Sequence, residues 1–262
     1  DDYIEGGGGN DVLAGGPGRD LVIGGVGDDH LRGASTGVPL SRAWSVTPVA
    51  TILAGIQLVN GIWVIPNAVF ANFIGSDNLD DTTGDILFGE AGNDYLTGSS
   101  GEDYLDGGVD DDILYAHTGN DILIGATGND WLHAGRGDDI VLGGAGADHV
   151  FGDLEDSTAG PEGHDYLDGG AGQDELYGHG GDDVLSGGTD NDKLSGGADN
   201  DLLTGGPGND SLNGGTGNDT YYLSLGDAQD TLTDEAGTDT VSFASAIDLN
   251  TARLSLTAAG LA

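Results

Sequence analysis

The sequence predicts an all-β repeat protein, and three observations carry this prediction. Most of the chain divides into nine-residue blocks with the pattern G-G-x-G-x-D-x-U-x, in which U is a large apolar residue. The composition is that of turns, because 52 of the 262 residues are glycine and aspartate outnumbers glutamate by 39 to 7. Each block also supplies one large apolar side chain at the same place. A fixed short period of this kind indicates an architecture in which each block is one structural unit.

Sixteen complete blocks keep this register: three fill residues 6–32, seven fill 89–151 and six fill 169–222. Aspartate occupies the sixth place in all sixteen. Leucine or valine occupies the eighth place in fifteen, and the last block has Tyr221 there. Shortened blocks with the same ending occur at Asp2–Ile4, Asp85–Leu87 and Asp165–Leu167.

Glycine fills the first place in fourteen blocks and the fourth place in thirteen. The exceptions at the fourth place are Asp110, Asp190 and Asp199. Aspartate tolerates left-handed backbone angles better than most residues, so even these exceptions predict a positive φ at the fourth place.

The apolar residues alone cannot hold such a chain closed. One buried apolar side chain per block offsets only part of the entropy that is lost when nine residues become ordered. The formal net charge of −40 adds self-repulsion. Calcium is a natural source of the missing stabilisation, because it takes about six to eight oxygen ligands from carboxylates and carbonyls.

The nonapeptide pattern resembles the repeats-in-toxin (RTX) family of haemolysin-type calcium-binding repeats, and the resemblance covers about two thirds of the chain. It implies a parallel β-roll, a β-solenoid in which six residues of each block form a turn and three form a short strand. Two blocks then complete one coil of eighteen residues. A Ca²⁺ ion between successive turns would meet two aspartates that are eighteen residues apart.

The sixth-place aspartates are therefore the candidate metal ligands. Pairs that are eighteen residues apart within uninterrupted stretches, such as Asp94 with Asp112 and Asp183 with Asp201, number thirteen. We therefore expect roughly thirteen or more Ca²⁺ ions as cofactors. The full set of candidate ligands is Asp2, Asp11, Asp20, Asp29, Asp85, Asp94, Asp103, Asp112, Asp121, Asp130, Asp139, Asp148, Asp165, Asp174, Asp183, Asp192, Asp201, Asp210 and Asp219.

Residues 34–83 interrupt the repeat after a first roll segment at 1–33. From residue 43 to 76 the chain carries no charged residue. Asn60 and Gly61 lie between two apolar runs, which is a strong signal for a β-hairpin. Polar residues break up the apolar stretch, so we do not expect a membrane span. Two interpretations stay open: a hairpin that covers the side or the start of the roll, or an exposed apolar patch at 43–76 for self-association or partner docking.

The main β-roll is expected at 84–222, with an acidic, turn-rich loop insertion at 153–162. After residue 222 the period fades, and alternating stretches such as Thr238–Phe243 predict longer strands. Repeat arrays need an atypical end unit to close their core, and RTX proteins often carry a similar D-T-V-x-F segment after the last repeat. We therefore expect residues 223–262 to form a C-terminal β cap.

No catalytic motif fits its surroundings. Gly33–Gly37 matches the pattern G-x-S-x-G, but Pro39 follows closely and no helical pattern lies nearby, so we do not expect Ser35 to be a nucleophile. The chain has no H-E-x-x-H motif, no phosphate-binding loop and no EF-hand loop. The six histidines occupy different places in the blocks, which predicts scattered surface positions rather than one row. We expect no enzymatic activity in this chain.

The charge and the repeats together indicate a role. A net charge of −40 argues against nucleic acid and anionic membranes as partners. The chain opens with the end of a repeat, so we expect it to be a fragment of a longer protein. The absence of cysteine does not argue against an extracellular location, and the RTX resemblance implies type I secretion.

We therefore expect a calcium-binding structural module of a secreted bacterial protein, outside the cell or at its surface. The parent would be a surface-layer, adhesin, filament or matrix protein, and the module would fold on Ca²⁺ after export. The alternative is an accessory or secretion module of an extracellular lipase, protease or polysaccharide-modifying enzyme whose catalytic domain lies outside this chain.

Overall fold

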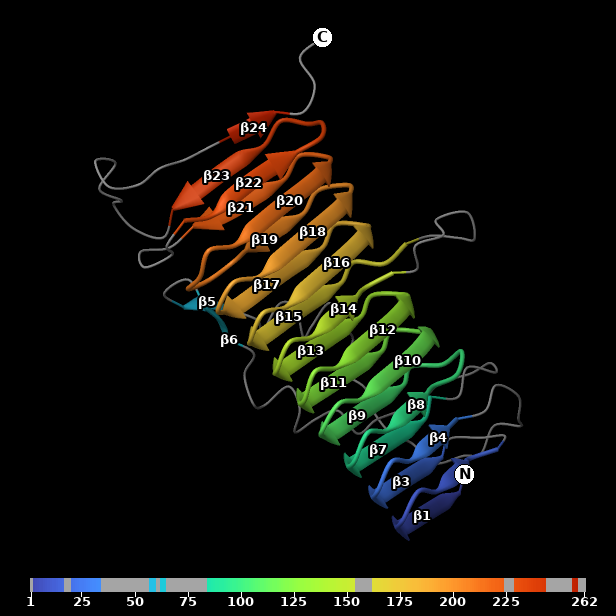
Figure 1. Cartoon of the computed structure of the whole chain (residues 1–262). Helices are drawn as coiled ribbons and strands as arrows, with labels where there is room; N and C mark the ends of the chain where they lie inside the picture. Colours follow the sequence, from blue (N-terminus) through green and yellow to red (C-terminus); the bar gives the residue numbers. More distant parts are fainter. Residues whose placement is uncertain are drawn as a thin grey trace.

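The computed structural model describes residues 2–16, 20–33, 57–59, 62–64, 84–153, 162–223, 229–243 and 256–258. The regular elements among these residues are all β-strands. Two parallel sheets of eleven strands each face one another along the length of the molecule (Figure 1). The chain passes from one sheet to the other at every block, so the fold is the predicted parallel β-roll.

The first sheet, sheet A, contains every second strand of the roll. In spatial order its strands are β1 (Tyr3–Gly8), β3 (Leu21–Val26), β7 (Ile86–Ala91), β9 (Tyr104–Val109), β11 (Ile122–Thr127), β13 (Ile140–Ala145), β15 (Tyr166–Ala171), β17 (Val184–Thr189), β19 (Leu202–Thr204), β21 (Thr220–Leu223) and β23 (Thr240–Phe243).

The second sheet, sheet B, contains the alternate strands. In spatial order these are β2 (Val12–Ala14), β4 (His30–Arg32), β8 (Tyr95–Thr97), β10 (Ile113–Thr118), β12 (Trp131–Arg136), β14 (His149–Phe151), β16 (Glu175–Gly180), β18 (Lys193–Ala198), β20 (Ser211–Thr216), β22 (Thr231–Asp234) and β24 (Leu256–Ala258).

The pairing register is one coil of eighteen residues, as Tyr3 opposite Leu21 shows. The roll also continues across both interruptions. Leu21 of β3 pairs with Ile86 of β7, on the far side of residues 34–83. Ile140 of β13 pairs with Tyr166 of β15, on the far side of the loop at 153–162. The strands on either side of each interruption therefore pair as successive coils of the same roll.

The core is two columns of eighth-place side chains that meet between the sheets. Leucine and valine fill these columns because an eighth-place side chain points inward from every strand, and these residues pack well on a pleated surface. Their side chains are almost fully buried. Sheet A contributes Val22, Leu87, Leu105, Leu123, Val141, Leu167, Leu185, Leu203 and Tyr221, and sheet B contributes Leu31, Leu96, Leu114, Leu132, Val150, Leu176, Leu194, Leu212 and Leu232.

Most strands are longer than the three residues that the family resemblance implies. Strands such as β11 and β17 have six residues, from the seventh place of one block to the third place of the next. The reason is that parallel pairing resumes at the second and third places, as for Gly7 with Gly25 and Gly8 with Val26. Three-residue strands occur at β2, β4, β8, β14 and β19.

Both sheets continue beyond residue 222. β22 pairs with β20, and β23 pairs with β21 through Thr240 opposite Thr220. The register in this region is twenty residues, because two extra residues separate the blocks. A capping role for 223–262 stays a prediction.

Within the first interruption, β5 (Gln57–Val59) and β6 (Ile62–Val64) pair antiparallel, with Val59 opposite Ile62. This pairing brackets Asn60 and Gly61, where the sequence predicts a hairpin. The rest of 34–83 and the turn residues 154–161 lie outside the described residues, as does Ser35.

Candidate metal-binding turns

The sixth-place aspartates form two ladders along opposite edges of the roll. Each aspartate directly precedes a strand, so its position along the axis is fixed by the sheet register. The ladder before sheet A contains Asp2, Asp20, Asp85, Asp103, Asp121, Asp139, Asp165, Asp183, Asp201, Asp219 and Asp239, and the ladder before sheet B contains Asp11, Asp29, Asp94, Asp112, Asp130, Asp148, Asp174, Asp192, Asp210 and Asp230.

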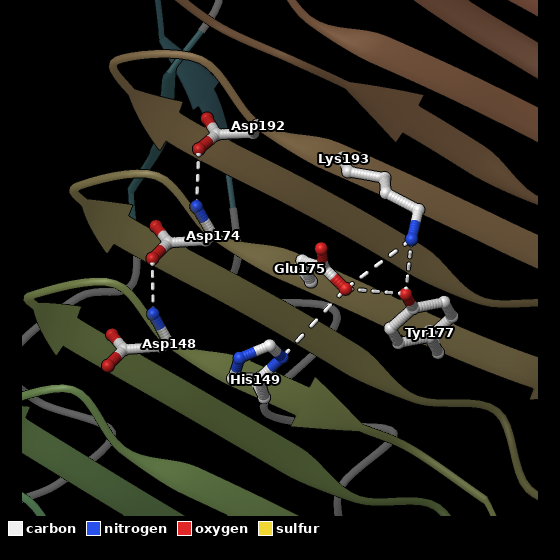
Figure 2. A network of polar contacts seen from close by, with 7 residues as sticks. All are labelled: Asp148, His149, Asp174, Glu175, Tyr177, Asp192 and Lys193. Atoms are coloured by element: carbon white, nitrogen blue, oxygen red, sulfur yellow. Dashed lines mark hydrogen bonds and ion pairs between the residues drawn. The ribbon is translucent and has the colours of Figure 1, made fainter.

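One contact repeats along both ladders. The backbone N–H of each aspartate donates a hydrogen bond to Oδ1 of the aspartate in the next coil, for example from Asp112 to Asp130 at 2.8 Å. Figure 2 shows two successive contacts, from Asp148 to Asp174 at 2.8 Å and from Asp174 to Asp192 at 3.0 Å. There are ten such contacts in the ladder before sheet A and nine in the other, with distances of 2.5 to 3.2 Å.

The ladders bring together every predicted ligand and extend the set. The thirteen pairs expected from the eighteen-residue spacing are all in contact. Four further contacts cross the interruptions: Asp20–Asp85, Asp29–Asp94, Asp139–Asp165 and Asp148–Asp174.

Two ladder members at the C-terminal end, Asp230 and Asp239, are missing from the sequence prediction. Asp230 accepts from the N–H of Asp210 at 3.0 Å, and Asp239 accepts from that of Asp219 at 3.2 Å. A signal was present, because each is followed two residues later by an apolar residue, Leu232 or Val241. The loss of the leading glycines and the two-residue shift of the period concealed it.

The second carboxylate oxygen, Oδ2, lacks a hydrogen-bond donor in most of these turns. Most ladder aspartates are buried, and their Oδ2 atoms are shielded from solvent yet receive no hydrogen bond. A buried charged oxygen without a partner is strongly unfavourable, so this arrangement calls for a cation. The ladder residues with such an Oδ2 include Asp11, Asp29, Asp94, Asp112, Asp121, Asp130, Asp139, Asp148, Asp165, Asp174, Asp183, Asp192, Asp201 and Asp219.

Asp103 is a local exception. Its Oδ2 accepts a hydrogen bond from the N–H of Ser99 at 2.5 Å. Ser99 occupies the second place of its block. In this turn a backbone N–H therefore donates to Oδ2, whereas most other turns provide no donor for that oxygen.

Burial and the crowding of carboxylates raise the pKa values of several ladder aspartates. Burial, followed by the neighbouring carboxylates, raises the pKa of Asp112 to about 8 and that of Asp192 to about 8. Burial likewise raises the pKa of Asp130 to about 7. In the other ladder, burial and the adjacent aspartate raise the pKa of Asp121 and of Asp139 far above the usual range. Without a counter-ion, the folded state therefore favours the protonated carboxyl groups.

The glycines leave room for close approach of oxygen atoms within each turn. A Cβ at the first-place Gly24 would meet Oδ2 of Asp29, at 2.6 Å. A Cβ at the fourth-place Gly27 would collide with the carbonyl oxygen of Gly9, one coil earlier. The turns thus bring carboxylate and carbonyl oxygens together in a space that side chains would fill.

The backbone is left-handed at the second and fourth places of most described turns, both where glycine stands there and where other residues do. The glycine at the fourth place of the first block, Gly9, has a φ of 108°. Among the described residues, seven that are not glycine also have positive φ, between 73° and 86°, and all occupy these two places. They are Glu90, His117, Ala126 and His179 at the second place and Asp110, Asp190 and Asp199 at the fourth.

This donor set fits calcium. It consists of carboxylate and carbonyl oxygens, which are the ligands that Ca²⁺ prefers, and it offers buried oxygens that lack any other partner. Ca²⁺ would be held by sixth-place carboxylates of successive coils and by turn carbonyls. It would supply the positive charge that the Oδ2 atoms need.

A further buried carboxylate lies in the turn at the second interruption. Asp153 is buried, its Oδ2 accepts from the N–H of Gly163 at 2.9 Å, and its Oδ1 has no hydrogen-bond partner. Burial raises its pKa to about 6. Asp153 stands at the second place of the interrupted block, so the sixth-place rule could not find it.

The described histidines gather on one face, contrary to the scattered positions that the sequence predicts. Five of the six contribute to a row of aromatic side chains on the outer face of sheet B. Neighbouring coils stack their rings, as in Tyr115 with His133 at 4.5 Å and His133 with Phe151 at 4.4 Å between centroids. The other histidines of this row are His30, His117, His149 and His179. The prediction was wrong because it compared places within the block. Strands of sheet B lie side by side every eighteen residues, so outward side chains from the seventh, ninth and second places of successive strands become neighbours.

The same face carries a small polar network, drawn in Figure 2. Tyr177 donates to Glu175 at 2.7 Å, and the Lys193 ammonium lies 2.6 Å from the Tyr177 hydroxyl and 3.4 Å from Glu175. His149 lies 3.8 Å from Glu175. These groups are partly exposed, so they decorate the sheet rather than complete a buried site.

A parallel roll with two oxygen-lined turns per coil defines a class of calcium-binding repeat proteins. The family model of the RTX calcium-binding nonapeptide repeat matches more than half of the chain, and the chain belongs to this family. The matched residues are 1–34, 80–114, 115–150, 124–158, 160–194, 186–221 and 195–229. A comparison with curated proteins found no match.

The chain therefore contains RTX calcium-binding repeats folded as a β-roll, and RTX repeats bind Ca²⁺. Among the described residues, no helix is long and apolar enough to cross a membrane.

Proposed function

We propose that this protein is a structural module of a secreted bacterial protein and folds when it meets Ca²⁺ outside the cell. The observation that carries the proposal is the column of buried Oδ2 atoms without hydrogen-bond partners along both edges of the roll. RTX repeats are typical of secreted proteins, which supports the location and the type I export route.

The physical argument is one of linkage. A ligand that binds only the folded chain adds its binding free energy to folding. With little calcium, as in the cytosol, the aspartates repel one another and the chain stays extended and exportable. At millimolar calcium the ions neutralise the ladders and the coils close.

The number of ions follows from the ladder contacts. If each of the nineteen contacts marks one calcium site, the bound charge is about +38, close to the formal charge of −40. The loaded roll is then nearly neutral, which suits a rigid spacer, filament or surface-layer component. We propose this structural role in place of a catalytic one.

The test is a calcium titration of the metal-stripped 262-residue chain, followed by far-UV circular dichroism and sedimentation velocity. We expect a cooperative gain of β signal and a smaller hydrodynamic radius as Ca²⁺ is added. Mg²⁺ at the same concentrations is the control and should be much less effective, because it requires a tighter octahedral shell. A stripped chain that is already folded, and that does not respond to Ca²⁺, would overturn the proposal.

A further inference from the structure

Two departures from the repeat meet at the C-terminal end of the roll. Tyr221 is the one eighth-place residue of the complete blocks that is not leucine or valine. Asp234 ends β22 and stands five residues before Asp239, where most complete blocks have the first-place glycine. The Tyr221 hydroxyl lies 3.2 Å from Asp234 Oδ1 and 2.7 Å from the carbonyl oxygen of Thr233. Hence Asp234 contacts the unusual core residue directly.

The Tyr221 hydroxyl also contacts β20. It accepts a hydrogen bond from the N–H of Gly214 at 2.7 Å. Its oxygen is therefore fixed between β20 and the end of β22, which limits where the Asp234 carboxylate can lie.

Asp234 joins two members of the ladder before sheet A. Asp219 donates its N–H to Oδ1 of Asp239 at 3.2 Å, as in every other ladder contact. One carboxylate oxygen from each of Asp219, Asp234 and Asp239 lies within 4.8 Å of the other two. This turn therefore presents three carboxylates.

One oxygen of this group is buried without a partner. Asp219 is 0% exposed, and its Oδ2 receives no hydrogen bond. Burial and then the Asp234 carboxylate raise the pKa of Asp219 to about 6. Burial and then Asp239 also raise the pKa of Asp234. Among the described residues, no lysine or arginine forms an ion pair with these three aspartates.

We propose that Asp219, Asp234 and Asp239 together hold one Ca²⁺ ion and that this site binds calcium most tightly of the array. Affinity at oxygen-only sites rises with the number of charged ligands, and a third carboxylate adds one charge to the two of an ordinary ladder pair. Tyr221 acts as a positioning residue for Asp234. The inference deepens the proposed function and rests on it, because it assumes that the ladder turns bind calcium.

Terbium provides a direct test, because Tb³⁺ replaces Ca²⁺ at oxygen sites and favours the site with the most carboxylates. The calcium-loaded 262-residue chain, which stays folded throughout, is titrated with Tb³⁺. Bound terbium is counted by elemental analysis, and tyrosine-sensitised luminescence is recorded. We expect one ion per chain to bind on the order of tenfold more tightly than the rest. Its luminescence should be strong because Tyr221 lies next to Asp234.

Variants assign this first ion to the cluster. Asp234→Asn should abolish the tight phase and leave the weaker ones. Glu235→Gln is the matched control, since it removes the same charge from the next, exposed residue and should retain the tight phase. Tyr221→Phe should weaken the tight phase by a smaller factor and lower its luminescence.

The outcomes separate this inference from the proposed function. An unchanged tight phase in Asp234→Asn, or no tight phase in the parent chain, overturns the three-carboxylate site even if calcium folds the chain. Failure of calcium to fold the stripped chain overturns both.

Discussion

The inner columns of leucine and the outer ladders of aspartate are built alike and behave differently. Both place one residue per block in the eighteen-residue register, and both are buried; Leu132 and Asp130 are each 0% exposed. A leucine column needs only its neighbours, because apolar burial is favourable in any aqueous solution. An aspartate column leaves charged oxygens without partners and becomes favourable only when a cation or a proton neutralises them.

This difference teaches that one repeat encodes two separate properties. The leucines form the core between the two sheets, and we propose that the aspartates set the conditions under which the strands form. Because the two columns alternate within every block, we expect each described segment of the roll to need calcium in order to fold at neutral pH. The following predictions test the comparison, from the largest expected effect to the smallest.

Acidification should replace calcium in the metal-free chain. The ladder carboxyls have folded-state pKa values raised by burial, to about 8 for Asp112 and about 7 for Asp130, against a usual value of 3.8. A group whose pKa is higher in the folded state adds stability that is complete below its unfolded pKa and is lost as the pH rises through its folded pKa. We therefore expect β signal to increase as the pH falls from about 8.5 to about 5.

Circular dichroism in chelator-treated, metal-free buffer measures this effect. A midpoint between about 6 and about 8 identifies the ladders, whereas surface carboxylates titrate near about 4. A chain that remains unfolded down to pH about 5 would show that protonation cannot stand in for the ion.

Truncation of the leucine column should destabilise the calcium-loaded roll. Leu132→Ala removes a fully buried side chain from β12, between Leu114 and Val150, and should cost about 2–5 kcal/mol of unfolding free energy. Urea unfolding at saturating Ca²⁺ is the measurement. Ile113→Ala is the control, since Ile113 is 37% exposed on the outer face of sheet B and its loss should cost less than about 1 kcal/mol. Equal losses would mean that the inner column is not the core of the roll.

Neutralising one ladder carboxylate should have an effect that depends on calcium. Asp130→Asn keeps an Oδ1 acceptor for the N–H of Asp112 but removes the charge. At saturating Ca²⁺ we expect a loss of about 1–3 kcal/mol in urea unfolding. In metal-free solution the same change should leave the acid-induced gain of β signal unchanged or move it to higher pH, because it relieves repulsion with Asp112 and Asp148.

The control for this variant is Asp111→Asn, in the adjacent fifth place. Asp111 is exposed and accepts from the N–H of Asn129 at 2.7 Å, so its neutralisation should change stability by less than about 0.5 kcal/mol with or without calcium. If Asp130→Asn and Asp111→Asn change folding equally both with and without calcium, the ladder aspartates are not the calcium ligands.

The sequence by itself determined the repeat, the two buried columns and the calcium chemistry. Strict nine-residue spacing leaves only one way to place Asp94 over Asp112 once two blocks form a coil. Glycine at the fourth place also predicted a backbone with positive φ, as Gly27 illustrates with a φ of 137°. These features are local, and each block repeats the same information many times.

Only the tertiary structure decided which distant parts continue one another. Asp29 contacts Asp94 although the insertion at 34–83 separates them in the sequence. The reason is that β4 pairs with β8, the next strand of sheet B, whatever the length of chain between them. The register between coils likewise places Asp239 in the ladder before sheet A. It also brings Asp234 close to Asp219 and stacks His133 on Tyr115. The nine-residue repeat specifies the structure of each block. Which blocks become neighbours depends on the insertions and on the two-residue shift near the C-terminus, and only the folded roll shows this.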